Sequence, residues 1–255
     1  MLQSDWFVPH VKPLNIGHRG ASAAAPQNTL AAFRRALEFG ADGVELDVHL
    51  SLDGAVVVIH DFTVDKTTDG AGRVSQKTLA QLKALDAGVK FSPQFAGERI
   101  PTLSEVFDAL EGKLLVNVEL KAPLHSANTS LVAPVLDVVR KHGMDKRVVF
   151  SSFNTRVLGA MKRLAPHIPA GVLYAPDLPA YARYAWLDPF EPHEARHPHF
   201  SMVTRLIVRW CHARGLQVNV WTVDDPGEIR RLVEAEVDAI ITNKPDVLGN
   251  VLRDA

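Results

Sequence analysis

Short apolar runs alternate with segments of helical periodicity along nearly the whole chain. Most of the helical segments begin at capping signals: Asn28 before residues 29–33, Thr78 with Gln81, Thr102 with Glu105, and Asp225-Pro226. Strand-like runs occur at residues 14–17, 44–48, 56–59, 114–120, 148–151, 171–174, 217–222 and 239–242. Eight strands alternating with helices in 255 residues predict an α/β fold of the (β/α)8 barrel type.

Residues 62–100 interrupt this alternation. The segment is too long for a plain loop and contains one predicted helix, at residues 79–85. We expect a small insertion subdomain after the third strand, within a single barrel domain that takes up residues 1–255.

Two acidic residues share one face of the predicted strand 44–48. Glu45 and Asp47 alternate with apolar residues, so their side chains lie about 7 Å apart along the strand. Carboxylates in such surroundings repel each other and resist burial unless a positive charge lies beside them. A hard divalent cation meets this requirement, so the pair predicts a metal site.

The connection from this strand to residues 56–59 has two interpretations. Asp53-Gly54 is a signal for a two-residue hairpin turn, and such a turn would put Asp47 directly opposite His60. The alternative is a parallel return, which is awkward because parallel crossovers need about a dozen residues. Both arrangements bring His60 towards the carboxylates.

The overall composition is that of an ordinary globular protein, with 47% hydrophobic and 22% charged residues. The 28 basic and 29 acidic residues give no basic excess, which indicates a small-molecule partner and argues against nucleic acid. No apolar run of about 18 residues is present, so no transmembrane segment is expected. The first ten residues lack the basic start and apolar core of a secretory signal, which favours a cytoplasmic location. The sequence does not predict an oligomeric state.

Several motifs together resemble the glycerophosphodiester phosphodiesterase family, over about residues 14 to 250. They are His18-Arg19-Gly20, Pro26-Gln27-Asn28-Thr29, Glu45-x-Asp47, His60-Asp61, Glu119-Leu-Lys121, Trp221-Thr-Val and Ile-Ile-Thr-Asn243. Their order and joint presence are specific, although each is weak alone. Two positions depart from the family pattern: Gln27 replaces the usual Glu, and Asn243 stands where Asp is often found.

The resemblance implies a hydrolase of lipid and glycerol metabolism, which splits glycerophosphodiesters into sn-glycerol 3-phosphate and an alcohol. It implies that Glu45, Asp47 and Glu119 hold one divalent cation, Mg²⁺, Ca²⁺ or Mn²⁺, and that His18 and His60 are the general base and acid in that order. It also implies that residues 62–100 lie over the active site of a TIM barrel.

Three further side chains are candidates for the substrate or for the structure around it. Arg19 offers a planar fork for phosphate oxygens, and Lys121 offers a point charge. The alternative is a purely structural salt network of the carboxylates with these two cations. Trp221 has two interpretations: stacking against the substrate, or filling the mouth of the barrel.

Other activities and sites remain as alternatives. A lysophospholipase D, or a related phospholipid phosphodiesterase, would need an apolar track, for which the aromatic-rich residues 173–190 are a candidate wall. A non-catalytic binding protein would lack a ligand or a histidine, and none is missing. His193, His197 and His199 have a spacing compatible with a transition metal, but the neighbouring prolines favour a solvated loop. The nucleophile is either water or the substrate's own glycerol hydroxyl.

Overall fold

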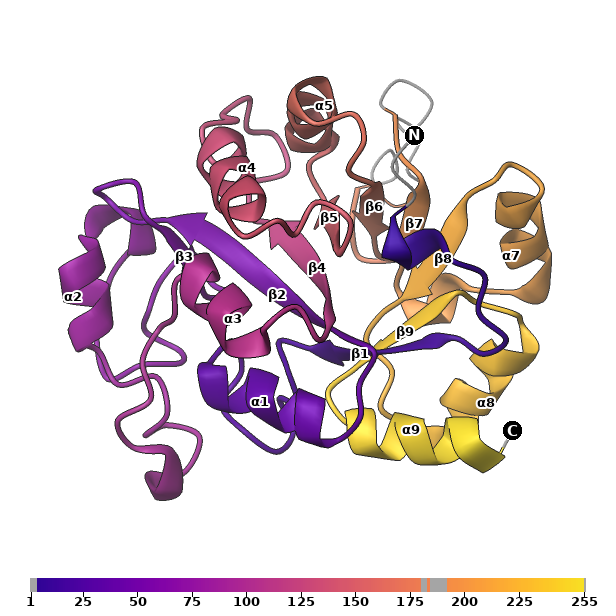
Figure 1. Cartoon of the computed structure of the whole chain (residues 1–255), viewed down its shortest axis with the longest axis horizontal. Helices are drawn as coiled ribbons and strands as arrows, with labels where there is room; N and C mark the ends of the chain where they lie inside the picture. Colours follow the sequence, from indigo (N-terminus) through magenta and orange to yellow (C-terminus); the bar gives the residue numbers. More distant parts are fainter. Residues whose placement is uncertain (1–3, 180–182, 184–191, 255) are drawn as a thin grey trace.

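The computed structural model, which describes residues 4–179, 183 and 192–254, contains a closed barrel of parallel strands. The barrel closes because β1 pairs in parallel with both β2 and β9 (Figure 1). The barrel strands are β1 (Leu14–His18), β2 (Gly43–Leu50), β4 (Leu115–Leu120), β5 (Val148–Ser152), β6 (Ala170–Tyr174), β7 (Ala195–Pro198), β8 (Gln217–Val220) and β9 (Ala239–Thr242). The predicted (β/α)8 barrel is confirmed.

Helices cover the outside of the barrel. They are α1 (Leu30–Glu38), α3 (Leu103–Leu110), α4 (Val132–Lys141), α5 (Thr155–Leu164), α7 (Arg205–His212), α8 (Pro226–Glu234) and α9 (Pro245–Asp254). Outward residues of the strands, such as Leu46 and Val118, pack with apolar helix residues such as Phe33 in one buried cluster. No helix among the described residues is long and apolar enough to cross a membrane.

The amino-terminal end of the barrel is closed by the first described residues. Trp6, in the short 3-10 helix η1 (Asp5–Phe7), packs with inward residues of the strands such as Ile16 and Val149. Its indole Nε1–H donates to the Arg147 carbonyl at 2.9 Å. The amino-terminal end of the barrel is therefore filled by packed side chains, which leaves the carboxyl end for a site.

The predicted number of barrel strands is right, but two individual assignments are wrong. Residues 56–59 form β3 (Val56–Val58), which pairs antiparallel with β2 and lies outside the closed barrel. The missing barrel strand is β7, in the stretch predicted as a solvated loop. Pro198 ends β7, and its carbonyl still accepts the Trp221 N–H at 3.3 Å, so the prolines are compatible with a short strand.

The β2–β3 connection is a hairpin, as one of the two interpretations predicted, but its loop has three residues. The Ser51 N–H donates to the Ala55 carbonyl at 2.9 Å, which leaves residues 52–54 in the loop. Gly54 has φ 81°, the left-handed conformation that three-residue hairpin loops require at this position.

This extra loop residue shifts the expected pairing by one. The residue opposite Asp47 is Ile59, whose N–H donates to the Asp47 carbonyl at 3.0 Å, and the predicted Asp47–His60 pair is wrong. The His60 carbonyl instead contacts His49 Nε2 at 3.1 Å.

The segment 62–100 contains the 3-10 helices η2 (Val74–Gln76) and η3 (Pro93–Phe95) and the helix α2 (Leu79–Ala84), beside β3 (Figure 1). It has its own small apolar cluster, in which Val64, Leu82 and Ile100 pack with Val57 of β3. The predicted helix is confirmed, and a single domain that includes this segment stays a prediction.

The predicted helix caps are confirmed with one exception. Thr78 and Thr102 form capping boxes, and Asp225 caps α8. The cap of α1 is Thr29 and not Asn28. Asn28 has φ 58° and turns its side chain inward, where Nδ2 donates to Asp47 Oδ2 at 2.8 Å.

Candidate active site

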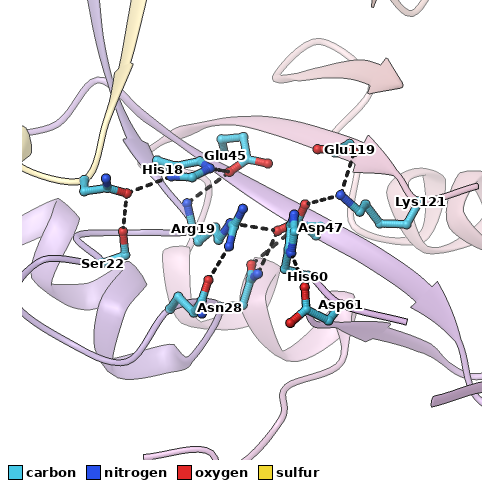
Figure 2. Close-up of polar contacts among 12 residues, drawn as sticks. His18, Arg19, Ser22, Asn28, Glu45, Asp47, His60, Asp61, Glu119 and Lys121 are labelled. Atoms are coloured by element: carbon cyan, nitrogen blue, oxygen red, sulfur yellow. Dashed lines mark hydrogen bonds and ion pairs between the residues drawn. The ribbon is translucent and has the colours of Figure 1, made fainter. Parts of the chain in front are cut away.

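Strand register brings the candidate residues together at the carboxyl end of the barrel. His18 of β1 is in register with Glu45 of β2, and Asp47 of β2 is in register with Glu119 of β4. Because side chains on alternate strand positions point into the barrel, these residues converge on one space (Figure 2).

Glu45, Asp47 and Glu119 form a buried acidic cluster whose ligand oxygens lie within 4.8 Å of one another. Burial, followed by repulsion from Asp47 and Glu119, raises the pKa of Glu45 well above its ordinary value. Burial also raises the pKa of Glu119 to about 7. Burial alone would raise the pKa of Asp47 too, but Lys121 and Arg19 hold it below its ordinary value.

Two cations neutralise only part of this cluster. Asp47 lies between Arg19 Nε, at 3.4 Å from Oδ2, and Lys121 Nζ, at 3.3 Å from Oδ1 (Figure 2). Lys121 Nζ also donates to Glu119 Oε1 at 2.8 Å. Glu45 has no such ion pair with either cation: its Oε2 accepts the Arg19 backbone N–H at 3.0 Å. Arg19 and Lys121 offset only two of the three negative charges. The three converging carboxylates supply oxygen donors that fit one hard divalent metal ion.

The turn after β1 gives Arg19 its position. Arg19 has φ 54° and Gly20 has φ 83°. A Cβ on Gly20 would lie 2.5 Å from the carbonyl carbon of Ala32, so only glycine fits between this turn and α1. The Arg19 Nη1 atom donates to Gln27 Oε1, so the neutral amide at this departure from the family pattern still binds the guanidinium.

His18 is oriented by a chain of polar contacts. Its Nδ1 lies 2.7 Å from Asn243 Oδ1, while Asn243 Nδ2 donates to Asp224 Oδ2 at 2.6 Å. Since this amide oxygen can only accept, His18 carries its proton on Nδ1 and leaves the Nε2 lone pair free. Nε2 lies 3.9 Å from Glu45 Oε2. Burial, and next the Arg19 charge, lower the pKa of His18 to about 4.

His60 follows β3 and has a different partner. Its Nδ1 lies 2.6 Å from Asp61 Oδ1, so a carboxylate lies beside this imidazole. Burial lowers the pKa of His60, whereas Asp47 and the hydrogen bond to Asp61 act in the opposite direction. The two histidines therefore differ in the charge of the group behind each ring.

A cavity of about 140 Å³ lies against both histidines. Its polar lining residues are His18, Arg19, Glu45, His60, Asn117, Glu119 and Ser151, and its apolar lining residues are Phe153, Leu173, Trp221 and Ile241. Trp221 Nε1 donates to the His197 carbonyl at 2.8 Å, and its ring meets Phe153 edge-on. The indole is thus an anchored part of the cavity wall.

All eight candidate residues lie at this end of the barrel, and six of them line the cavity. Asp47 and Lys121 are not among the lining residues. The sequence did not reveal the contacts of Asn28, Asp61 and Asn243 with this site, although all three stand in the motifs quoted above. Within the described part of the chain, the acidic cluster is the only group with metal-ligand geometry, and His193, His197 and His199 form none.

Comparisons with known proteins agree with this geometry. The model of the "Glycerophosphoryl diester phosphodiesterase family" matches residues 18–247. A glycerophosphodiester phosphodiesterase of Caldanaerobacter subterraneus subsp. tengcongensis is 43% identical over 245 residues, which are 95% of this chain and 99% of that protein.

Solved structures show the same similarity. An Oleispira antarctica phosphodiesterase in complex with the product sn-glycerol-3-phosphate has a TM-score of 0.85 at 33% identity, over 95% of this chain and 97% of that one. A Silicibacter pomeroyi protein described as a glycerophosphoryl diester phosphodiesterase has a TM-score of 0.86 at 31% identity, over 96% of this chain and 95% of that one. The chain belongs to the glycerophosphoryl diester phosphodiesterase family of enzymes.

Proposed function

We propose that this enzyme hydrolyses glycerophosphodiesters to sn-glycerol 3-phosphate and an alcohol, with one divalent cation and two histidines. The observation that carries the proposal is the cavity bounded by His18, His60 and the acidic cluster. A relative supports the proposal, because the Oleispira antarctica phosphodiesterase was solved in complex with the product sn-glycerol-3-phosphate.

Glu45, Asp47 and Glu119 are the residues that would hold the cation. A bound Mg²⁺, Ca²⁺ or Mn²⁺ would neutralise phosphate oxygens and lower the pKa of an attacking oxygen. Lys121 and Arg19 keep Asp47 ionised, so that this oxygen donor is available at neutral pH. Lys121 Nζ also donates a 2.8 Å hydrogen bond to Glu119 Oε1, which opposes, but does not cancel, the rise of the Glu119 pKa on burial. A direct contact of Lys121 with the phosphate stays a prediction.

His18 is assigned as the general base. Its proton is on Nδ1, where Asn243 Oδ1 accepts it at 2.7 Å, so Nε2 is the nitrogen that can take a proton from the nucleophile. Its lowered pKa, about 4, keeps the imidazole neutral near pH 7. The oxygen that loses the proton belongs to water or to the free glycerol hydroxyl next to the phosphate.

His60 is assigned as the general acid. Burial lowers the pKa of His60, but the Asp61 carboxylate at 2.6 Å opposes that shift and stabilises the protonated ring, which can give a proton to the departing alkoxide. Arg19, which also lines the cavity, presents its guanidinium to the phosphate oxygens. Acid and base thus come from two different strand ends, and displacement in line at phosphorus needs them on opposite sides of the phosphate.

A comparison of two substrates tests this function against its main alternative. Glycerophosphocholine and a long-chain lysophosphatidylcholine should be supplied at equal concentration, and sn-glycerol 3-phosphate and choline release measured. A cavity of about 140 Å³ suits the glycerol compound, so turnover should strongly favour glycerophosphocholine. Faster turnover of the lysophospholipid would favour the lysophospholipase D alternative. Most of its candidate wall, residues 180–182 and 184–190, lies outside the described residues.

A further inference from the structure

Two polar side chains in the floor of the cavity have no assigned role. Asn117 of β4 and Ser151 of β5 are 1% and 0% exposed, and both line the cavity. Asn117 lies on the inward face of β4 with Glu119, and Ser151 is in register with Glu119 on the neighbouring strand. They therefore lie directly beside the acidic cluster.

Each of these side chains has a buried oxygen without a hydrogen-bond partner among the described residues, Oδ1 of Asn117 and Oγ of Ser151. Leaving a buried polar atom unpaired costs free energy, and native proteins rarely do so without a ligand or water at that point. Branched apolar residues would fill the interior of a barrel at no such cost. The two oxygens therefore indicate a polar group against the floor, either a ligand or a water molecule that a ligand displaces.

The chemistry of the two atoms restricts what that ligand can be. The cation proposed for this site has its own ligands in Glu45, Asp47 and Glu119. The amide oxygen of Asn117 can only accept, so a ligand group that hydrogen-bonds to it must carry a proton to donate. A phosphodiester anion carries no proton to donate, and the carboxylates of Glu45 and Glu119 beside the floor would repel its negative charge. A hydroxyl meets both conditions, because it donates to Asn117 and accepts from the hydroxyl of Ser151.

We infer that Asn117 and Ser151 bind a free hydroxyl of the substrate's glycerol moiety. The inference rests on the proposed function and adds to it a basis for selectivity. Rejection of an analogue that lacks the hydroxyl would be strong, because it would leave two buried polar atoms unpaired. Phe153 and Trp221, which also line the cavity, offer apolar surface to the carbons of the same glycerol.

Competitive inhibition by two small phosphates tests this inference. sn-Glycerol 3-phosphate carries the hydroxyls and propyl phosphate lacks them, so the ratio of their inhibition constants isolates the hydroxyl contribution. The wild-type enzyme should prefer sn-glycerol 3-phosphate, and Ser151→Ala and Asn117→Leu should each reduce that preference roughly fivefold, the value of one neutral hydrogen bond. Binding of propyl phosphate should change little.

Ser152→Ala is the matched control on the same strand. The Ser152 side chain points outward, and its Oγ donates to the Leu120 carbonyl at 2.8 Å. This variant should lower Tm without changing the inhibitor ratio, whereas Ser151→Ala removes an unpaired group and should leave Tm of the ligand-free protein unchanged or higher. A lowered Tm with an unchanged ratio in Ser151→Ala would overturn the inference.

A third pair of ligands distinguishes the glycerol from the headgroup. Phosphoethanolamine can donate hydrogen bonds through its ammonium, whereas phosphocholine cannot. If the floor binds the headgroup, Ser151→Ala and Asn117→Leu will change the ratio for this pair, and the glycerol assignment fails. An enzyme that hydrolyses no glycerophosphodiester would refute the proposed function itself, whatever the ratios are.

Discussion

The His18 Nδ1 atom lies 2.7 Å from Asn243 Oδ1, and this contact determines which nitrogen of the histidine faces the cavity. The amide cannot turn over without losing its 2.6 Å hydrogen bond from Nδ2 to Asp224. Ser22 Oγ also donates to Asn243 Oδ1, at 2.7 Å. Asn243 is therefore a positioning residue for the proposed base.

Replacing Asn243 tests this role. Asn243→Leu should lower kcat about 10- to 100-fold with little change in KM, because the imidazole can then adopt the unproductive tautomer while the cavity lining is retained. Ser22→Ala is the control, since it removes one donor to the amide and leaves the contact with His18. Steady-state kinetics of both variants give the answer, and a large rise in KM with unchanged kcat in Asn243→Leu would contradict it.

The division of roles between the histidines predicts a dependence on the leaving group. His60→Asn should lower kcat about 10²- to 10⁴-fold with choline as the leaving alcohol. The same variant should recover much of its rate with p-nitrophenol, which needs little protonation. His18→Asn should stay slow with both substrates because the base is missing. Equal losses for both variants on both substrates would refute this assignment.

The acidic cluster predicts how stability of the metal-free protein depends on pH. The raised pKa of Glu119, about 7 against 4.5 in the unfolded chain, means that the folded state binds the proton more tightly. The contribution of Glu119 to the free energy of unfolding is present below pH 4.5. It is lost as pH rises to about 7, by about 1.4 kcal/mol per pH unit for one proton. In EDTA, Glu119→Gln should lack this loss, as measured by urea unfolding at several pH values. Parallel pH profiles of wild type and variant would contradict it.

The turn after His18 predicts a difference between two glycines. Gly20 and Gly40 both have positive φ, but a Cβ on Gly20 would collide with Ala32, whereas nothing lies within 4 Å of one on Gly40. Gly40→Ala should cost only backbone strain, about 1 kcal/mol. Gly20→Ala should cost clearly more and also lower activity by displacing Arg19. Similar free energies of unfolding for the two variants would show that the close approach to α1 is not important.

The sequence predicted the fold because alternating apolar runs and capping signals are local. The barrel strands with apolar runs were located to within a few residues, but β7 was missed, since Ala195–Pro198 contains only one aliphatic residue and is buried through contacts that are distant in sequence. β3 was counted as a barrel strand because its apolar run is like that of a parallel strand. The Asp53-Gly54 signal predicted the hairpin, but it did not distinguish two loop residues from three.

The candidate residues of the site were predicted from motif spacing at strand ends. Their supporting contacts were not predicted, because these depend on pairs that are far apart in the chain. Asn28 looked like a helix cap and instead binds Asp47. Asn243 looked like a neutral replacement, yet it contacts His18 from just after β9, 225 residues further along the chain. Asn117 and Ser151 were visible only as polar residues in apolar strands.

The most direct test of the central claim is the release of sn-glycerol 3-phosphate from glycerophosphocholine with and without divalent cation. The enzyme should be inactive in excess EDTA and should recover when Mg²⁺, Mn²⁺ or Ca²⁺ is added back beyond the chelator. Glu45→Ala, Asp47→Ala and Glu119→Ala should need much more cation for the same recovery, and calorimetry should show weaker cation binding. Full release of sn-glycerol 3-phosphate in excess EDTA would contradict the account.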